Sequence, residues 1–507
     1  MWVTNFICIM IITQMRIDFT PNVRVDDDTL GWSQRMPSLA INPAGDTLYC
    51  VFRDNRYGFH DFPGLTLAKS SDRGATWSEN LLIYYGEFDL ESSMRIAVDH
   101  QGWLHVVFGF TSPGGVWYTK STDGGYNWTF PVIISDTITT VPVNSVSFKA
   151  DSNDNLYVMW HYFYEGVSND YDIFFTRSMD HGATWLHPNI IVNDTVSCMN
   201  QYPSFCFGGH DTVYVVWQDN RLPICQILFS RSTDAGITWL DSNIKINPDS
   251  NLCNLYPRIA PSNNILYCVW TECPGWTGCL KSAKSTNAGD TWSQPVVISD
   301  SFVRQKGLLA FDVDTIGNLY VVWPDSRQDT SDIFFSYSSD SGNTWYSPSI
   351  RVNDDTTQRP QSFVDILANG PDDIYVVWAD ARADTFTHPY PGPDIYFARG
   401  SIISSLNEKQ SCKSNDVNLQ ILPNPFSRLT HISLSSIQTI YYSKLEIYSI
   451  TGALIKSFEN SGDHQSLSSK IVWDGTNSQG FKVPAGVYYI ILKLSNRCIA
   501  KKVVFIK

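Results

Sequence analysis

The chain has 507 residues, of which 43% are hydrophobic and only 17% are charged, and its formal net charge is −14 at pH 7. The shortage of charged residues disfavours a coiled coil, a helical bundle and a disordered chain, and the acidic balance argues against a nucleic-acid partner. Aromatic residues reach 14%, including 17 Trp, which is typical of an all-β protein because Trp, Tyr and Val fit half-buried pleated surfaces.

The chain begins with an apolar run at residues 2–12. This run has about the length of the apolar part of a secretory signal and is too short to span a bilayer. We interpret residues 1–18 as a signal-peptide remnant or an N-terminal extension, and the alternative is a buried N-terminal strand. No other stretch of the sequence is long and apolar enough for a transmembrane helix.

A pattern of eight residues, S-x-D-x-G-x-x-W, recurs between Ser70 and Trp345. Its copies are about 50 residues apart, which suits one four-stranded blade of a β-propeller. We expect the third residue to accept hydrogen bonds from amides of its own turn, and the Gly to supply a backbone angle that other residues resist. That third residue is Asp72, Asp123, Asp180, Asp234, Asn287 and Asp340 in the six copies.

A second repeated string, of the type LYVVW, predicts the central strand of each blade. Its copies begin at Leu48, Leu104, Leu156, Val213, Leu266, Leu319 and Ile374. There are seven such strings but six turns. The N-terminus explains the difference, because residues 20–38 resemble residues 347–362. The strand around Val23–Val25 is therefore expected to complete the blade begun by Gln361–Arg399, which removes open sheet edges. We predict an all-β fold with a seven-bladed propeller over residues 19–400, and a six-bladed ring with one stray unit is the alternative.

The repeat ends after Gly400. Residues 401–416 are polar and Ser-rich, as in a linker. Residues 417–507 alternate strand patterns with Asn-Pro, Thr-Gly and Asp-Gly turns, which predicts a small β-sandwich.

Both modules resemble known families. The six turns are similar to the Asp boxes, or BNR repeats, of sialidases and many other secreted propellers. The pieces LPNPF at 422–426, VWDGTNSQG at 472–480 and VPAGVYYIILK at 483–493 resemble the C-terminal sorting domains of type IX secretion in Bacteroidetes-like bacteria. That resemblance implies contact with the type IX secretion machinery and a secreted or outer-membrane, cell-surface location in a Gram-negative bacterium. The alternative is a generic immunoglobulin-like accessory domain.

The first blade resembles sialidases beyond its turn, because Arg35-Met36-Pro37 matches their R-I-P motif. The resemblance implies that Arg35 belongs to an arginine triad that clamps the substrate carboxylate, since guanidinium pairs with carboxylate in a planar fork. It also implies an acid/base Asp after the second strand, for which Asp61 is the nearest match.

The other members of such a site are chosen by position. The family nucleophile is a Tyr activated by a Glu, for which Tyr390 is a candidate by elimination. Glu272 follows a central strand, and the alternative is a variant of the Asp that recurs there. The candidate ligand-binding residues are three arginines near first strands, Arg258, Arg304 and Arg359, and three tryptophans assigned to irregular loops, Trp32, Trp117 and Trp276.

An Asp-x-Arg pair follows several central strands. It occurs as Asp54–Arg56, Asp219–Arg221, Asp325–Arg327 and Asp380–Arg382. A pair present in four blades favours a repeated ion pair over a single active site.

The cysteine and histidine patterns indicate no cofactor and no metal. Cys50 and Cys268 are expected to be buried thiols, and Cys273 and Cys279 could close a small disulfide. The cysteine spacings match no zinc pattern, and the sequence contains no phosphate-cradling Gly loop.

Three functions fit these patterns. The first is a non-catalytic propeller that binds glycan or a surface protein, which the regularity of the repeats favours. The second is a sialidase-like exo-glycoside hydrolase, and the third is another propeller enzyme, such as a lyase or a different glycosidase. We predict an exported monomer with a carbohydrate or surface-protein ligand.

Overall fold

The chain divides into two compact units, Asp18–Ser401 and Ile402–Lys507, the second taken together with Met1–Ile17. The structure is a computed structural model, and it describes residues 16–57, 63–86, 93–111, 114–136, 143, 145–163, 171–194, 198–209, 211–221, 224–273, 278–300, 303–304, 308–328, 330–383, 392–403, 418–435, 442–449, 454–459, 471–494 and 498–506. Strands dominate, and the one helix among these residues is the single 3-10 turn Asn55–Tyr57.

The larger unit contains seven antiparallel sheets in its described residues. Sheet 1 is β3 (Gln34–Ile41), β4 (Leu48–Asp54), β5 (Gly64–Ser70) and β6 (Leu81–Tyr84). Sheet 2 is β7 (Met94–Val98), β8 (Leu104–Thr111), β9 (Gly114–Ser121) and β10 (Val132–Ile133). Sheet 3 is β11 (Val146–Ala150), β12 (Leu156–Phe163), β13 (Tyr171–Ser178) and β14 (Ile190–Ile191). Sheet 4 is β15 (Asn200–Phe207), β16 (Val213–Asp219), β17 (Gln226–Ser232) and β18 (Ile244–Lys245).

The remaining sheets follow the same order. Sheet 5 is β19 (Cys253–Ser262), β20 (Ile265–Cys273), β21 (Cys279–Ser285) and β22 (Val296–Val297). Sheet 6 is β23 (Ala310–Val313), β24 (Leu319–Gln328), β25 (Thr330–Ser338) and β26 (Ile350–Arg351). Sheet 7 is β27 (Gln361–Ala368), β28 (Ile374–Asp380) and β29 (Asp394–Ile403), with β1 (Arg16–Phe19) and β2 (Val23–Arg24) both beside β29. These repeated sheets are consistent with a β-propeller.

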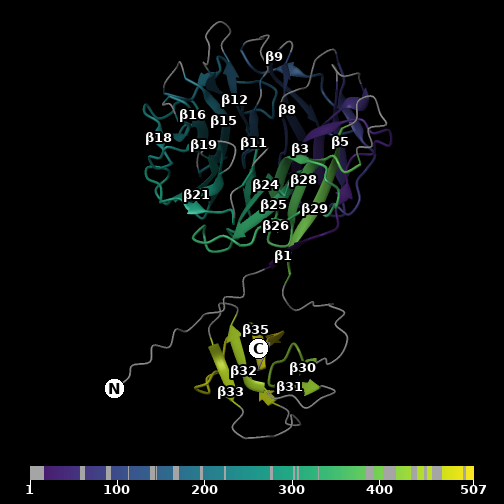
Figure 1. Ribbon diagram of the computed structural model, residues 1–507, viewed down its shortest axis with the longest axis vertical. Helices are drawn as coiled ribbons and strands as arrows, with labels where there is room; N and C mark the ends of the chain where they lie inside the picture. Colours follow the sequence, from purple (N-terminus) through teal and green to yellow (C-terminus); the bar gives the residue numbers. More distant parts are fainter. Residues whose placement is uncertain are drawn as a thin grey trace. The chain divides into compact units, whose positions relative to one another are not determined.

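The N-terminal strand completes sheet 7, as the sequence similarity predicts. Val23 pairs with Phe397 and Arg24 with Tyr396 in antiparallel register. Arg24 then bonds to both Asp26 and Asp394 at 2.7 Å. In Figure 1 the green β28 and β29 lie beside the purple β3 and β5, and side chains of sheets 1 and 7 share one hydrophobic core. The first and last sheets of the unit are therefore neighbours.

The repeated LYVVW strings form the second strand of each sheet, and they are buried on both faces. Every residue of β4 and of β28 is buried. Trp217, Trp270 and Trp323, each the last residue of its string, are fully buried. Burying one such side chain stabilises the fold by roughly 1.5–3 kcal/mol. The hydrophobic core of the larger unit therefore lies between neighbouring sheets.

The S-x-D-x-G-x-x-W turns join the third and fourth strands and have the predicted local chemistry. In the first turn Asp72 accepts a hydrogen bond from the Thr76 amide at 2.9 Å, and the Ser70 hydroxyl accepts one from the Gly74 amide at 2.8 Å. Gly74 has φ +84°, a conformation that favours Gly. The ring of Trp77 packs 5.3 Å from that of Phe397 in sheet 7.

The smaller unit has its own core. One sheet is β30 (Asn418–Leu422), β31 (Thr430–Ser435) and β34 (Ile471–Trp473), and the other is β33 (Leu454–Glu459), β32 (Tyr442–Ser449), β35 (Gly486–Leu494) and β36 (Cys498–Phe505). Trp473 of the first sheet and Leu445 and Ile490 of the second belong to one buried cluster. The two sheets therefore share a hydrophobic interior.

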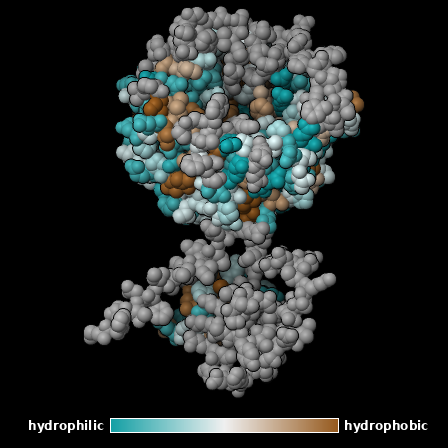
Figure 2. Space-filling model, in the orientation of Figure 1, coloured by the Kyte–Doolittle hydropathy of each residue, from teal (hydrophilic) through white to brown (hydrophobic). Residues whose placement is uncertain are grey.

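Where Figure 2 colours the larger unit, the surface is mostly hydrophilic, with hydrophobic residues in small separate patches. The described residues include no helix long and apolar enough to cross a membrane.

The turn geometry predicts that Gly74→Ala is much more harmful than Gly124→Ala. A Cβ at Gly74 would lie 2.0 Å from Cε1 of the buried Phe397, whereas Gly124, at φ +74° in the second turn, has nothing within 4 Å of that position. We expect a loss of about 2–4 kcal/mol at Gly74 and about 1 kcal/mol at Gly124, measured by urea unfolding. Equal losses would show that the turn does not pack against the neighbouring sheet.

Candidate functional site

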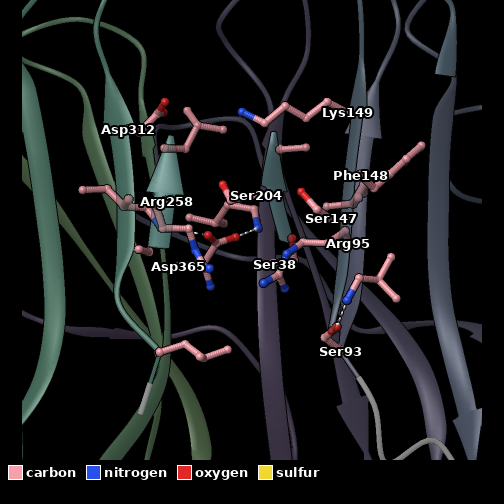
Figure 3. Close-up of a pocket in the computed structure, with 18 of the residues that line it drawn as sticks. Ser38, Ser93, Arg95, Ser147, Phe148, Lys149, Ser204, Arg258, Asp312 and Asp365 are labelled. Atoms are coloured by element: carbon pink, nitrogen blue, oxygen red, sulfur yellow. Dashed lines mark hydrogen bonds between the residues drawn. The ribbon is translucent and has the colours of Figure 1, made fainter. Parts of the chain in front are cut away.

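A cavity of about 530 Å³ lies where the first strands of the seven sheets meet. Its described lining comes from β3, β7, β11, β15, β19, β23 and β27 and the residues that lead into them. We call it the central cavity. Because only first strands and their leading residues contribute, side chains far apart in the sequence face one common space (Figure 3).

Strand register determines which side chains belong to the same layer of the central cavity. The residue paired with the fourth position of each LYVVW string is Ser38, Arg95, Ser147, Ser204, Arg258, Ala310 or Asp365. Two residues further along their strands, Lys149 and Asp312 form part of a second layer. All nine line the cavity, so its charge comes from three cations and two carboxylates.

A β-bulge precedes the cavity residue in four of the described sheets. Register shifts fall between Arg35 and Ser38, Gln201 and Ser204, Leu255 and Arg258, and Ser362 and Asp365. Each bulge contains one non-Gly residue in the left-handed region, and these residues are Met36, Tyr202, Tyr256 and Phe363 at φ +50° to +58°. Bulges re-aim the side chains that follow them, and here they precede Ser38, Ser204, Arg258 and Asp365.

The guanidinium groups of Arg95 and Arg258 occur in the same layer (Figure 3). Each donates to the carbonyl of the residue before it, Arg95 to Met94 at 2.8 Å and Arg258 to Pro257 at 2.9 Å. Burial, and then the positive charge of Arg95, lowers the pKa of Arg258 to about 10, against the opposing charge of Asp365. No described carboxylate lies within 4.0 Å of either guanidinium, so both keep N–H donors for another group.

The two carboxylates of the cavity are bonded to neighbouring sheets. Asp365 accepts the Leu39 amide of sheet 1 at 3.0 Å, and Asp312 accepts the Ala368 amide that follows in sheet 7 at 2.8 Å. Burial raises the pKa of Asp312, against the opposing charge of Lys149. These acids hold adjacent first strands together, whereas the two arginines keep unused hydrogen-bonding capacity.

Of the residues predicted from sequence, Arg258 lines the central cavity. Arg35 does not: it is exposed, and its Nε donates to Ser33 Oγ at 2.9 Å. The strand register places Gln201, Leu255 and Ser362 at the position of Arg35 in their sheets. The Met36-Pro37 that follows Arg35 is one copy of a repeated bulge, which recurs as Tyr202-Pro203.

Glu272 occupies the position of the Asp that ends other central strands. It lies in β20 opposite Cys279, and its carboxylate is 3.5 Å from Lys281 Nζ. The described lining of the central cavity does not include it. The alternative reading, a variant of the repeated Asp, therefore describes its place in the fold.

The other predicted residues are dispersed or undescribed. Trp117 was expected in an irregular loop, but it lies inside β9 and packs against the core between sheets 1 and 2, because the strand begins at the Gly114-Gly115 pair. Trp32 precedes β3, and Arg304 and Arg359 precede β23 and β27, outside the described lining. Asp61, Tyr390 and Trp276 lie outside the described residues.

The repeated Asp-x-Arg motif forms ion pairs, as predicted. The four N–O distances, from Arg56 to Asp54, Arg221 to Asp219, Arg327 to Asp325 and Arg382 to Asp380, are 2.5–2.9 Å. Cys50 and Cys268 are buried thiols, also as predicted. The disulfide between Cys273 and Cys279 that the sequence allows is not formed: Cys279 lies opposite Glu272 across the hairpin, and Cys273 lies opposite Cys253.

Sequence reasoning missed four charged residues of the central cavity, Arg95, Lys149, Asp312 and Asp365. The LYVVW strings carried a usable signal. In each hairpin, the residues paired with the second and fourth positions of the string face the central cavity, so they can be located by counting back from the string. The bulges shift that count in four sheets, and a single sequence does not reveal them.

No protein-family model matches the chain, and no curated protein matches it. Among solved structures, it is similar to an ulvan lyase bound to a sugar containing glucuronic acid, with 12% identity and a TM-score of 0.53 over 74% of this chain and 95% of that one. A Hadza microbial sialidase has 16% identity and a TM-score of 0.44 over 70% of this chain and 76% of that one. The NanB sialidase from Streptococcus pneumoniae has 12% identity and a TM-score of 0.40 over 75% of this chain and 70% of that one. At such identities the similarity concerns the fold, which is propeller-like.

The environment of Arg258 predicts that this residue destabilises the fold. Because burial and Arg95 lower its pKa to about 10, Arg258→Met should raise the free energy of unfolding by about 1–3 kcal/mol in chemical denaturation. Arg304→Met, at an exposed position, is the control and should change it by less than about 0.5 kcal/mol. A clear loss of stability in Arg258→Met would show that the guanidinium has a structural partner.

Proposed function

We propose that the chain is an exported, seven-bladed propeller that binds an anionic glycan in its central cavity. The observation that carries this proposal is the pair Arg95 and Arg258, whose guanidinium groups share one cavity layer and meet no described carboxylate within 4.0 Å. The six S-x-D-x-G-x-x-W turns then act as Asp boxes that fix the blades, away from the ligand.

The chemistry of the arginine pair selects a carboxylate or sulfate group. A guanidinium offers parallel N–H donors that match the two oxygens of such a group. The chain as a whole carries a charge of −14. The cavity layer that contains Arg95, Arg258 and Asp365 has a net positive charge, so it differs in sign from the chain as a whole. Uronic acids and sialic acids provide the matching anion on a sugar.

The lining supports binding more directly than hydrolysis. A sialidase-type reaction requires a Tyr nucleophile and an activating Glu. The described lining of the central cavity contains neither Tyr nor Glu. The hydrolase alternative rests on the resemblance at Arg35 and on Asp61 and Tyr390.

Export is the second part of the proposal. The sequence pieces of the smaller unit and its separate hydrophobic core support a β-sandwich that serves as a type IX sorting domain. A surface location would bring the central cavity to extracellular glycans.

The test is calorimetric titration of the full chain with a glucuronate-containing tetrasaccharide and with a neutral tetrasaccharide. We expect binding of the acidic sugar alone, weakened by salt. Arg95→Gln and Arg258→Gln should each weaken it tenfold or more, since a hydrogen bond to a charged group contributes roughly 1.5–3 kcal/mol. Arg304→Gln is the matched control and should bind as the wild type does.

Two results would contradict the proposal. One is equal binding of neutral and acidic sugars, and the other is unchanged affinity in both cavity variants. Turnover of a fluorogenic sialoside that is lost in Arg35→Ala would assign the chain to the hydrolases.

A further inference from the structure

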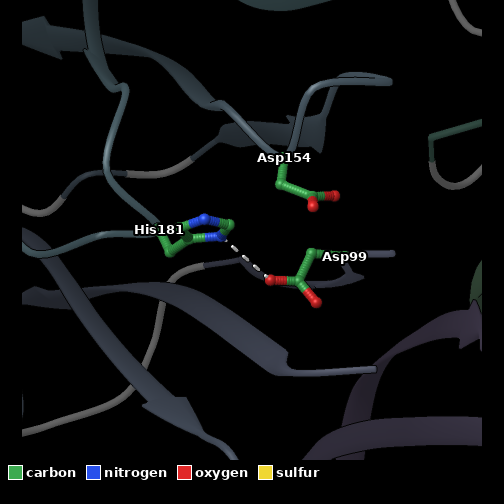
Figure 4. Close-up of side chains that lie close together, drawn as sticks. All are labelled: Asp99, Asp154 and His181. Atoms are coloured by element: carbon green, nitrogen blue, oxygen red, sulfur yellow. Dashed lines mark hydrogen bonds and ion pairs between the residues drawn. The ribbon is translucent and has the colours of Figure 1, made fainter. Parts of the chain in front are cut away.

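A cluster of potential metal ligands lies between sheets 2 and 3, outside the central cavity. Asp99 comes from the β7–β8 turn, Asp154 from the β11–β12 turn, and His181 from the S-x-D-x-G-x-x-W turn between β13 and β14. One ligand atom from each lies within 4.8 Å of the other two. Figure 4 shows the three side chains around a common space, with His181 directed at Asp99.

Asp99 is the buried member of the cluster, at 1% exposure. Its Oδ1 accepts the backbone amides of Gln101 and Trp103 at 3.0 and 2.8 Å. Its Oδ2 lies 3.4 Å from His181 Nδ1 and 3.1 Å from Nε2 of the buried His105.

The equivalent turn of sheet 6 shows how the hydrogen-bond partners of Asp99 differ from those in the repeat. Asp314 in sheet 6 begins the equivalent turn, and its Oδ2 accepts Asn318 Nδ2 and the Tyr320 hydroxyl, both at 2.8 Å. Sheet 2 has Trp103 and His105 at those two positions. The Asn donor is thus missing, and Oδ2 faces His181 instead.

His181 is also a departure from the repeat. In the other five turns the residue between Asp or Asn and Gly is Arg73, Gly124, Ala235, Ala288 or Ser341. The only imidazole at this position therefore occurs where it meets two carboxylates from neighbouring sheets.

We propose that Asp99, Asp154 and His181 bind a zinc ion. Two carboxylates and a neutral imidazole carry a charge of −2, which a divalent cation balances. Zinc accepts nitrogen and oxygen ligands at about 2.0–2.2 Å, so two tetrahedral ligands stand about 3.4 Å apart, as His181 Nδ1 and Asp99 Oδ2 do. Three protein ligands leave the fourth position for water.

The surrounding groups fit a zinc site. His105 bonds to Asp99, and Asp154 Oδ1 accepts both the amide and Nδ1 of His100 at 2.8 and 2.7 Å, so both carboxylates are oriented by neighbours. Lys120 is the nearby cation, and its Nζ is held by the His181 carbonyl at 2.8 Å. The ion would connect sheets 2 and 3 through three turns, and its role would be to stabilise the ring.

The repeat itself supplies variants that should fold. Asn264 occupies the position of Asp154 in the turn of sheet 5, with the same φ of +63°. Ala235 and Ala288 occupy the position of His181 in other turns. Asp154→Asn and His181→Ala are therefore mild changes to the fold, and Asp211→Asn, at the same turn position in sheet 4, is the matched control.

The experiment is equilibrium dialysis of the full chain against zinc chloride, followed by metal analysis and thermal unfolding. We expect one bound zinc per chain and a raised melting temperature in the wild type and in Asp211→Asn. Asp154→Asn and His181→Ala should each lose the bound zinc and the thermal shift, while keeping the circular dichroism spectrum of the wild type.

The proposal is overturned if the wild type retains no zinc. Zinc that remains bound at full stoichiometry in both ligand variants would place the ion elsewhere and would equally overturn it. The same dialysis against calcium chloride completes the test, because calcium prefers six to eight oxygen ligands. The zinc assignment would be contradicted if calcium bound as tightly as zinc and its binding were lost in Asp154→Asn but not in His181→Ala.

Discussion

The closure of sheet 7 by the N-terminal strand is the interaction on which the rest of the larger unit depends. Only Val23 and Arg24 form the β2 pairing with β29, but Arg24 also bonds to Asp26 and Asp394, whose side chains are buried. Breaking such a pair leaves a buried charge without a partner, which costs far more than the two strand residues suggest. Because sheets 1 and 7 share one core, this contact fixes the spacing of the first strands and hence the central cavity.

The charged side chains of the central cavity are of two kinds: some bond to a neighbouring sheet, and others are available to a ligand. Asp312 and Asp365 accept amides of the neighbouring sheet, and so contribute to the ring. Arg95 and Arg258 each bond to the carbonyl of the preceding residue, and burial, followed by the positive charge of Arg95, lowers the pKa of Arg258. Charge held at a cost in stability is a recurring property of functional sites.

The sequence predicted the elements that depend on periodicity and missed those that depend on register. The LYVVW strings identified the second strands because each is buried on both faces, and the similarity of residues 20–38 to 347–362 identified the partner of Val23. Trp117 was assigned to an irregular loop, although the two glycines that precede it open strand β9. Arg95 and Lys149 escaped notice because facing the cavity depends on pairing across a hairpin. In sheets 1 and 5, the bulges at Met36 and Tyr256 shift that pairing without any Gly to mark the positive φ.

The most direct measurement is a crystal structure of the full chain soaked with glucuronate or with sialic acid. The account predicts the sugar carboxylate between Arg95 and Arg258, with guanidinium N–H groups at hydrogen-bonding distance from both of its oxygens. A sugar bound elsewhere on the larger unit, with the central cavity filled only by water, would contradict the account.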